Sequence, residues 1–267
     1  MQTRREIIKS GLGLAGIIAA GKAPAALVRS FVAARAALTS GKRLPYDAEV
    51  EYLESTGTQW IDTGTSMKYG DDFELNFEIT KLMSANGYAG GYVLASVAPN
   101  GWSRSYVLGW YPKNSVQHFL FCFYYDESSY QKFPTPVANL EYIVSCHAER
   151  GNMTMTVNGV QYTDTANNTE VSGQLAMFAR ATQVANGKIT AVNAQSNVKI
   201  RSIKHYRSGA LINDFAPVRF TNELGQTEGA MFDRANPNIG RGRNGEPRTD
   251  GLYLNRGTGS FTIGPDK

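Results

Sequence analysis

Residues 73–79 read Phe-Glu-Leu-Asn-Phe-Glu-Ile, a strict alternation of apolar and polar side chains. Successive side chains of a β-strand point to opposite faces, so this alternation predicts a half-buried strand. One face of that strand would join a core and consists of Phe73, Leu75, Phe77 and Ile79. The other face would stay wet and carries Glu74, Asn76 and Glu78.

Runs of this kind continue from residue 46 to the end of the chain, separated by clusters of Gly, Asn, Asp and Pro. Asn158-Gly159, between 153–157 and 160–163, is a strong signal for a β-hairpin. No stretch after residue 45 keeps a 3.6-residue period over ten residues. We therefore predict one all-β domain over 46–267, an antiparallel two-sheet sandwich or jelly roll. Its other predicted strands are 106–110, 116–124, 142–148, 175–178, 198–206, 218–220 and 259–263.

The chain has 267 residues and a formal net charge of +4, but the positive charge is concentrated at its start. Residues 1–44 hold eight of the 27 Lys and Arg residues and one of the 23 Asp and Glu residues. The remainder therefore has 19 basic and 22 acidic residues and is mildly acidic. This asymmetry is typical of a targeting segment, and it argues against a nucleic-acid partner for the body.

The N-terminus has the order of a secretory signal: an Arg pair, a weakly apolar run at 11–20, and small residues at Ala23 and Ala25. We expect residues 1–25 to be a signal peptide that is cleaved after Ala25. The protein would then be exported to the periplasm, the cell surface or the medium. The alternative is a basic amphipathic helix on a cytosolic protein. The start resembles the bacterial twin-arginine signal at Thr3, Arg4, Arg5, Ile7, Ile8 and Lys9. This resemblance implies the twin-arginine translocase as a partner.

Residues 26–45 are rich in Ala and predict a helical stalk, which Gly41 can end and Pro45 keeps from resuming. No uncharged apolar run reaches 18 residues, so an ordinary membrane-spanning helix is not expected. If the signal is not cleaved, 5–38 would form one anchoring helix. That helix would be the membrane contact of the chain.

Three blocks of the body resemble a known family when they are taken together. The first reads Val-Glu-Tyr-Leu-Glu-Ser-Thr-Gly-Thr-Gln-Trp-Ile-Asp-Thr-Gly at 50–64, and its Trp60 is expected in the core. The second joins 199–206 to 211–219, and the third joins 231–234 to 254–266. In this order they resemble laminin-G-like, concanavalin A-like jelly-roll domains of bacterial surface and secreted proteins, which also occur in phage structural proteins. The resemblance implies the fold and leaves the function open, since the superfamily includes lectins, adhesion modules and glycoside hydrolases.

Aromatic rings in exposed loops are the predicted ligand-binding groups, since such rings stack on sugar faces. Trp102 lies in a turn-rich stretch, Trp110 and Tyr111 end a predicted strand at a turn, and Tyr130 follows a polar loop. The alternative for Trp102 is a ring folded over the edge of the sandwich.

A catalytic alternative rests on Glu74 and Glu78, the only pair that resembles the two carboxylates of glycoside hydrolases of this fold. At about 3.3 Å per residue their backbones lie roughly 13 Å apart, so the two side chains would have to lean together. Those hydrolases also have an Asp between the two glutamates, and this chain has Asn76 there. Our first interpretation is therefore that Glu74 and Glu78 lie on the solvent-exposed face of a strand and have no catalytic role.

No metal site or cofactor is predicted. His118, His147 and His205 lack the spacing of metal ligands, and we interpret them as structural. Calcium, which many lectins of this class use, stays an open alternative. The acids that could bind it show no loop consensus: Asp62, Asp71, Asp72, Asp126 and Asp214.

Two further features are left open by the sequence. Cys122 and Cys146 lie on strands that could be neighbours, and they are either two buried thiols or a disulfide. The Arg-bearing loop 235–251 is longer than the turn usual at this place in similar proteins, and we interpret it as a mobile, solvated insertion.

The sequence therefore predicts an exported, non-catalytic β-sandwich that binds a ligand at the bacterial surface or in the periplasm, with a carbohydrate as the first candidate. The first alternative is a structural or adhesive module whose ligand is a cell-surface protein. The second is a glycoside hydrolase that uses Glu74 and Glu78.

Overall fold

The computed structural model describes most of the domain that follows the predicted stalk. The predicted signal and the stalk up to residue 43 lie outside the described residues, as does Tyr130. Among the described residues, no helix has the length and apolar character needed to span a bilayer. The described residues are 44–68, 70–82, 91–98, 101–113, 116–122, 134–149, 152–164, 173–193 and 196–267.

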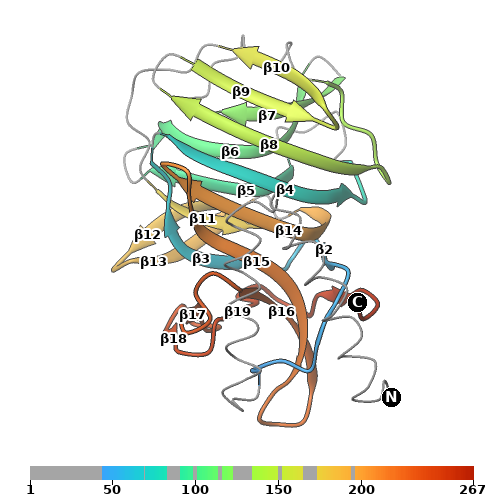
Figure 1. Ribbon diagram of the computed structural model, residues 1–267, viewed down its shortest axis with the longest axis vertical. Helices are drawn as coiled ribbons and strands as arrows, with labels where there is room; N and C mark the ends of the chain where they lie inside the picture. The colour runs from blue at the N-terminus through green and yellow to red at the C-terminus, as the bar shows by residue number, and fades with distance from the viewer. Residues whose placement is uncertain are drawn as a thin grey trace, which may run out of the picture. The chain divides into compact units, whose positions relative to one another are not determined.

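Two β-sheets form the described part of the domain (Figure 1). The larger sheet contains β1 (Ala48–Glu49), β2 (Leu53–Thr56), β4 (Asp71–Ile79), β8 (Glu141–Glu149), β9 (Asn152–Val157), β10 (Val160–Asp164), β14 (Asn197–Arg207), β15 (Ala210–Thr221), β16 (Thr227–Asp233), β17 (Gly240–Arg241), β18 (Pro247–Arg248), β19 (Leu252–Leu254) and β20 (Thr262–Ile263). The smaller sheet contains β3 (Ile61–Ser66), β5 (Gly91–Ala98), β6 (Gly101–Lys113), β7 (Val116–Cys122), β11 (Gln174–Met177), β12 (Arg180–Ala185) and β13 (Lys188–Asn193).

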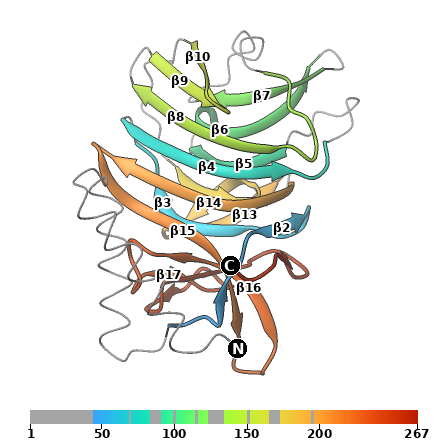
Figure 2. The same cartoon turned by 45° about the vertical axis from the view of Figure 1, so that its right-hand side comes forward.

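Most strand pairs are antiparallel, and several bring together distant parts of the chain. In the larger sheet β4 lies between β8 and β14, so strands far apart in the sequence are neighbours. Figure 2 shows this sheet from another side, with β10, β9, β8, β4 and β14 in spatial order. Parallel pairing is confined to β5 with β12 and β17 with β19. The all-β, mostly antiparallel, two-sheet prediction is confirmed for the described residues.

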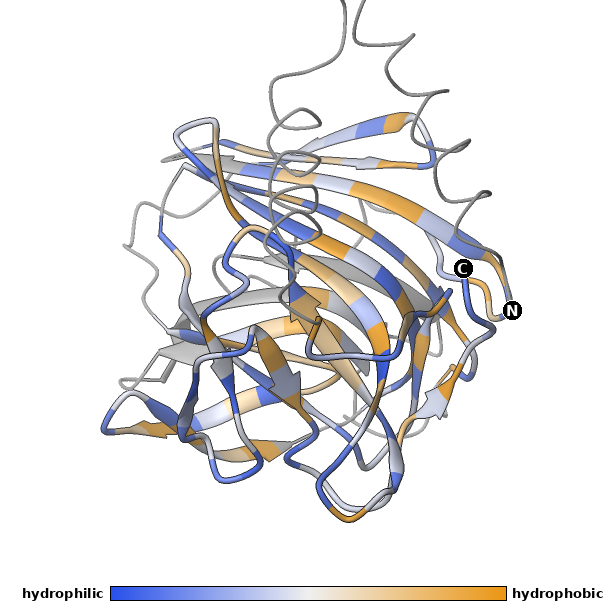
Figure 3. Cartoon of the chain, turned by 60° about the horizontal axis from the view of Figure 1, so that its bottom comes forward, coloured by the Kyte–Doolittle hydropathy of each residue, from blue (hydrophilic) through white to orange (hydrophobic). Residues whose placement is uncertain are grey.

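The alternation at 73–79 correctly predicts which side chains of β4 are buried. Phe73, Leu75, Phe77 and Ile79 are at most 2% exposed, and they join a core cluster with residues of the smaller sheet such as Leu94, Leu108 and Met177. The two sheets are therefore layers around one core. Figure 3 shows the alternation of hydrophilic and hydrophobic residues along the long strands.

The two ends of the domain are joined by strand pairing. β20 pairs with β2, and Val50 forms a bridge with Asp266. The Lys267 amide donates to the Glu49 carbonyl at 2.9 Å. Trp60 is 7% exposed in a smaller cluster with Ala176 and Ile189, so its predicted place in the core is confirmed.

Candidate ligand-binding site

Two rows of polar side chains cross the larger sheet on its outer face, the face opposite the core. Residues directly opposite each other on neighbouring strands share a face, and neighbouring strands lie about 4.8 Å apart. Row one runs over β14, β4, β8, β9 and β10 through Tyr206, Asp72, His147, Thr154 and Thr163. Row two runs over the same strands through Lys204, Glu74, Ser145, Thr156 and Gln161.

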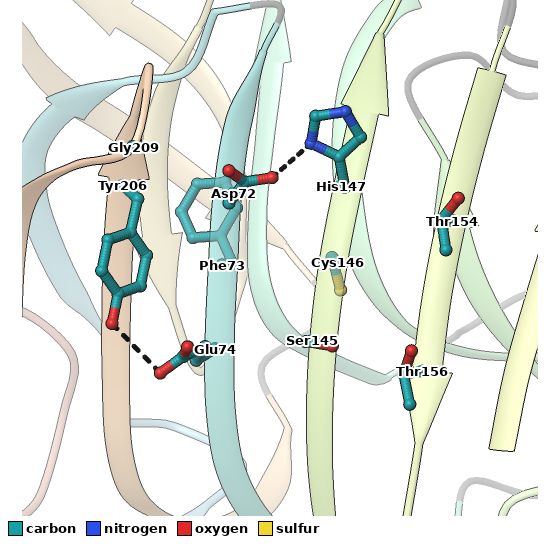
Figure 4. A pocket seen from close by; sticks show the side chains of 10 residues that line it. All are labelled: Asp72, Phe73, Glu74, Ser145, Cys146, His147, Thr154, Thr156, Tyr206 and Gly209. Carbon is teal, nitrogen blue, oxygen red and sulfur yellow. Dashed lines mark hydrogen bonds and ion pairs between the residues drawn. The ribbon is translucent and has the colours of Figure 1, made fainter. Parts of the chain in front are cut away.

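A hollow of about 360 Å³ opens on the outer face where the two rows meet β4 and β8. Its outward-facing lining combines a phenol, two carboxylates, an imidazole and hydroxyl groups (Figure 4). A single aromatic ring among convergent hydrogen-bonding groups is a lining suited to a polar organic ligand. The outward-facing residues of the hollow are Asp72, Glu74, Ser145, His147, Thr154, Thr156 and Tyr206.

Two interactions join residues that line the hollow, as Figure 4 shows, and a third comes from the neighbouring Lys204. His147 Nδ1 pairs with Asp72 Oδ1. The Tyr206 hydroxyl donates to Glu74 Oε2 at 3.1 Å, and Lys204 Nζ lies 3.5 Å from the same oxygen. Burial, followed by the nearby Glu74 carboxylate, raises the pKa of Tyr206 to about 12. The phenol therefore stays protonated at neutral pH and can act as a hydrogen-bond donor.

The carboxylates on the outer face of β4 differ in how many of their oxygens have protein partners. Both oxygens of Glu78 are in ion pairs, Oε1 with Lys199 at 2.8 Å and Oε2 with Arg201 at 3.3 Å. Glu74 and Asp72 use only one oxygen each for protein partners within the described part of the chain. Glu74 Oε1 and Asp72 Oδ2 therefore remain as acceptors at the hollow.

Asp71, His205 and Arg207 form a buried anchor on the inner face of β4 and β14, behind these side chains. Asp71 has no exposed side-chain surface and pairs with His205 Nε2 at 2.9 Å and with Arg207 Nε at 2.8 Å. The His205 ring stacks on Phe73, with centroids 4.5 Å apart. Burial acts to raise the pKa of Asp71, but hydrogen bonds from Arg207 and His205 hold it below its usual value. A buried ion pair thus lies directly behind the outward-facing Asp72 and Tyr206.

The structure contradicts one of the predicted ligand-binding aromatics. Trp110 is fully buried in the core and cannot stack on a ligand. It lies opposite Gly91, whose missing side chain leaves the space for the indole, since a Cβ there would be 2.0 Å from Trp110 Cζ2. Trp102 lies in β6, not in a turn-rich loop, and its side chain and that of Tyr111 are outside the described part. For Trp102, Tyr111 and Tyr130, ligand binding stays a prediction.

The histidines have different positions in the sheet. His205 is 1% exposed in the anchor, as predicted for a structural histidine. His147 instead faces outward, with a side chain that is 42% exposed, and it pairs with Asp72. The side chain of His118 lies outside the described part. Cys146 is buried on the inner face of β8, and the side chain of Cys122 is not described, so the disulfide question stays open.

The Arg-bearing loop 235–251 is folded, which corrects its interpretation as a solvated insertion. It forms β17 and β18, and β17 pairs with β19. The reason is local: Arg241 Nη1 donates to the Gly245 carbonyl at 3.1 Å, and Arg248 pairs with Asp250. A second hollow, of about 510 Å³, lies beside this segment and contains both Glu228 and Arg243, which pair with each other.

Among the described residues, no group of three or more His, Cys, Asp or Glu side chains could hold a metal ion. Asp62, one of the acids considered for calcium, is instead held by protein donors. Arg256 Nη1 lies 2.8 Å from Asp62 Oδ2, and the Ile189 amide donates to the same oxygen at 3.1 Å. The pKa of Asp214 is raised by its burial, which disfavours the charged form that a cation would need. Asp126 lies outside the described residues.

No protein-family model matches the chain, and no curated protein sequence does. Solved structures match weakly. A protein named as a β-glucanase from Mycobacterium abscessus is 13% identical, with a TM-score of 0.32 over 53% of this chain and 66% of its own. The sialidase of Trypanosoma rangeli is 11% identical, with a TM-score of 0.33 over 64% of this chain and 30% of its own.

A third match is SCP-B, a member of the eqolisin family of peptidases, at 9% identity and a TM-score of 0.29. It covers 62% of this chain and 84% of its own. Similarities of this size do not transfer an activity from one protein to another. The two-sheet architecture therefore rests on the strand pairing of this chain itself.

Proposed function

We propose that the domain is a non-catalytic carbohydrate-binding module that uses the hollow on the outer face of the larger sheet. The observation that carries the proposal is the convergence of the Tyr206 ring and polar side chains from β4, β8 and β9 on one hollow. An aromatic ring can cover the apolar face of a sugar, while carboxylates, hydroxyls and an imidazole bond to its hydroxyl groups. Binding of this kind requires no covalent step.

The two rows support an extended glycan as the ligand. Thr154 and Thr156 continue the polar lining from the hollow onto β9, and Gln161 and Thr163 extend it to β10. A glycan chain lying across the strands would meet a hydrogen-bonding side chain at each strand. Glu78, by contrast, has both oxygens in ion pairs, which disfavours the alternative of a glycosidase that uses Glu74 and Glu78.

The proposal also includes the finer features that the sequence predicts. The concanavalin A-like jelly roll is supported by the position of β4 between β8 and β14, a non-sequential strand order. Export by the twin-arginine route is supported by the residues at 3–9. An exported module of this kind would act on glycans outside the cytoplasm.

A glycan array, followed by calorimetry on the glycans that bind, tests the proposal with the full chain. Tyr206→Ala should weaken binding about tenfold or more, because it removes both the ring and the hydroxyl. Tyr206→Phe keeps the ring and should lose less. Ile143→Ala is the matched control, because Ile143 is a 64% exposed residue of β8 that does not line the hollow.

Two results would overturn the proposal. One is an array without binders at high protein concentration. The other is a glycan that the Tyr206→Ala variant binds as tightly as the unmodified protein. Release of new reducing ends from a bound polysaccharide would refute the non-catalytic part alone. Trp102→Ala, measured in parallel, tests whether the predicted edge aromatic contributes to the same binding.

A further inference from the structure

The two carboxylates at the hollow on the outer face each keep one oxygen that can accept a hydrogen bond from a ligand. Asp72 and Glu74 both line the hollow, with side chains that are 38% and 54% exposed. Among the described residues that line the hollow, none is a Lys or Arg. His147 engages Asp72 through Oδ1, and Lys204 approaches Glu74 at Oε2. The second oxygen of each carboxylate is left without a protein partner in the described part of the chain.

The Tyr206 ring stands beside these carboxylates and has its own attraction for a cation. The face of an aromatic ring attracts an ammonium group through its quadrupole. The Tyr206 hydroxyl is committed to Glu74 Oε2, which fixes the phenol next to that carboxylate. An aromatic ring with two carboxylate oxygens within one hollow is a combination that favours a protonated amine over a neutral hydroxyl.

From these contacts we infer that the ligand is a glycan that carries protonated amino groups, that is, a polymer or oligomer of amino sugars without N-acetyl groups. The inference rests on the proposed function and names its ligand class. The ammonium group would donate to Glu74 Oε1 and Asp72 Oδ2, and the sugar ring would lie against Tyr206. A neutral sugar can occupy the same hollow, but its hydroxyl groups donate only as neutral donors to the two remaining carboxylate oxygens. Charge-assisted hydrogen bonds are about twice as strong as neutral ones, so the amine is preferred.

Calorimetry with two oligosaccharides of the same length and linkage tests this inference on the full chain. One is an oligomer of β-1,4-linked glucosamine, and the other is its fully N-acetylated form. The glucosamine oligomer should bind about tenfold to a hundredfold more tightly, the range expected for a hydrogen bond to a charged group. Added salt should weaken its binding and leave that of the acetylated oligomer nearly unchanged.

Neutral variants of the two carboxylates locate the effect. Glu74→Gln and Asp72→Asn should each remove most of the preference for the amine, because they should weaken binding of the glucosamine oligomer much more than binding of the acetylated oligomer. Glu78→Gln is a control on the same face of the same strand, where both oxygens are already in ion pairs. Glu223→Gln is a control for net charge at an exposed residue away from the hollow. Both controls should keep the preference, and thermal unfolding should verify that each variant is folded.

The outcomes separate this inference from the proposed function. Equal affinity for the two oligomers would overturn the amine preference while leaving carbohydrate binding intact. An oligolysine peptide that competes as well as the glucosamine oligomer would also overturn it, because charge alone would then suffice. A preference that survives in Glu74→Gln and Asp72→Asn would place the amine elsewhere and refute the assignment. If neither oligomer binds and no other glycan does, both the inference and the proposed function fail.

Discussion

Replacing Asp71 with Asn is expected to destabilise the domain strongly, because it breaks the buried anchor behind the hollow. Asp71 accepts two hydrogen bonds from Arg207, from Nε and Nη2, each at 2.8 Å. It also accepts one from the Lys68 amide at 2.8 Å, and His205 Nε2 lies 2.9 Å away. An Asn side chain keeps one carbonyl oxygen, so its NH₂ group must face at least one of these donors.

The magnitude follows from the burial of the two charges. Removal of one partner from a buried ion pair costs about 3–5 kcal/mol, because the other charge is left uncompensated. The Asp71 side chain has no exposed surface, but the Arg207 side chain is 30% exposed and can regain part of its hydration. We therefore expect a loss of about 2–4 kcal/mol in the free energy of unfolding at neutral pH.

The pH dependence has a definite sign. The pKa of Asp71 is lowered in the folded state, so the unfolded chain binds a proton more readily at this site. The stabilisation is complete above the unfolded pKa of about 3.9 and is lost as the pH falls through the lower folded value. The difference between the unmodified protein and Asp71→Asn should therefore be largest near neutral pH and shrink in acid.

Urea unfolding followed by tryptophan fluorescence, at about pH 7 and about pH 3, measures both effects. Asp266→Asn is the matched control, since Arg219 binds Asp266 with the same two-point geometry, through Nε at 3.2 Å and Nη2 at 2.8 Å. That pair lies on the surface, and its loss should not change the urea midpoint measurably. Two results would contradict a stabilising role for the Asp71–Arg207 pair. One is equal urea midpoints for the two variants, and the other is a loss of stability in Asp71→Asn that is as large in acid as at neutral pH.

Three further changes test other parts of the molecule. Gly91→Ala should cost about 1–3 kcal/mol of stability in urea unfolding, since the added Cβ meets the fully buried Trp110 ring; an unchanged midpoint would contradict the packing described. Asp214→Asn should stabilise the domain at neutral pH, because burial raises the pKa of Asp214 and charging it in the fold costs free energy; the gain should vanish in acid, where Asp214 is protonated. The double variant Arg4→Lys, Arg5→Lys should keep the full-length precursor in the cytoplasm, which cell fractionation measures. Normal export of this variant would exclude the twin-arginine route.

The fold could be predicted from the sequence where a local pattern contains the answer. The alternation at 73–79 specifies which side chains of β4 are buried, and Asn158-Gly159 specifies the hairpin between β9 and β10. Both are properties of neighbouring residues in the chain. Trp110 shows the limit of such reasoning: its position at the end of a predicted strand suggested exposure, and only the cross-strand partner Gly91 explains its burial.

The candidate site could not be predicted, because it is a product of strand order. Alternation places Tyr206, Glu74, Ser145 and Thr156 on the wet face of their own strands, and this much is present in the sequence. Their convergence requires that β4 pair with both β14 and β8, across separations of more than sixty residues. No local signal encodes that pairing, so the sequence pointed to loop aromatics, whose exposure is easier to anticipate than a position on a sheet.

One strand links the stability of the domain to its proposed binding site. The register that places Asp71 opposite Arg207 also places Asp72 opposite Tyr206 and Glu74 opposite Lys204. A shift of β4 by one residue would send every side chain of the strand to the other face and expose its core residues. The buried ion pair at the start of β4 opposes such a shift, because only the observed register brings Asp71 to both Arg207 and His205. The geometry of the hollow is therefore maintained by the core side of the same strand, and loss of the anchor should affect stability and binding together.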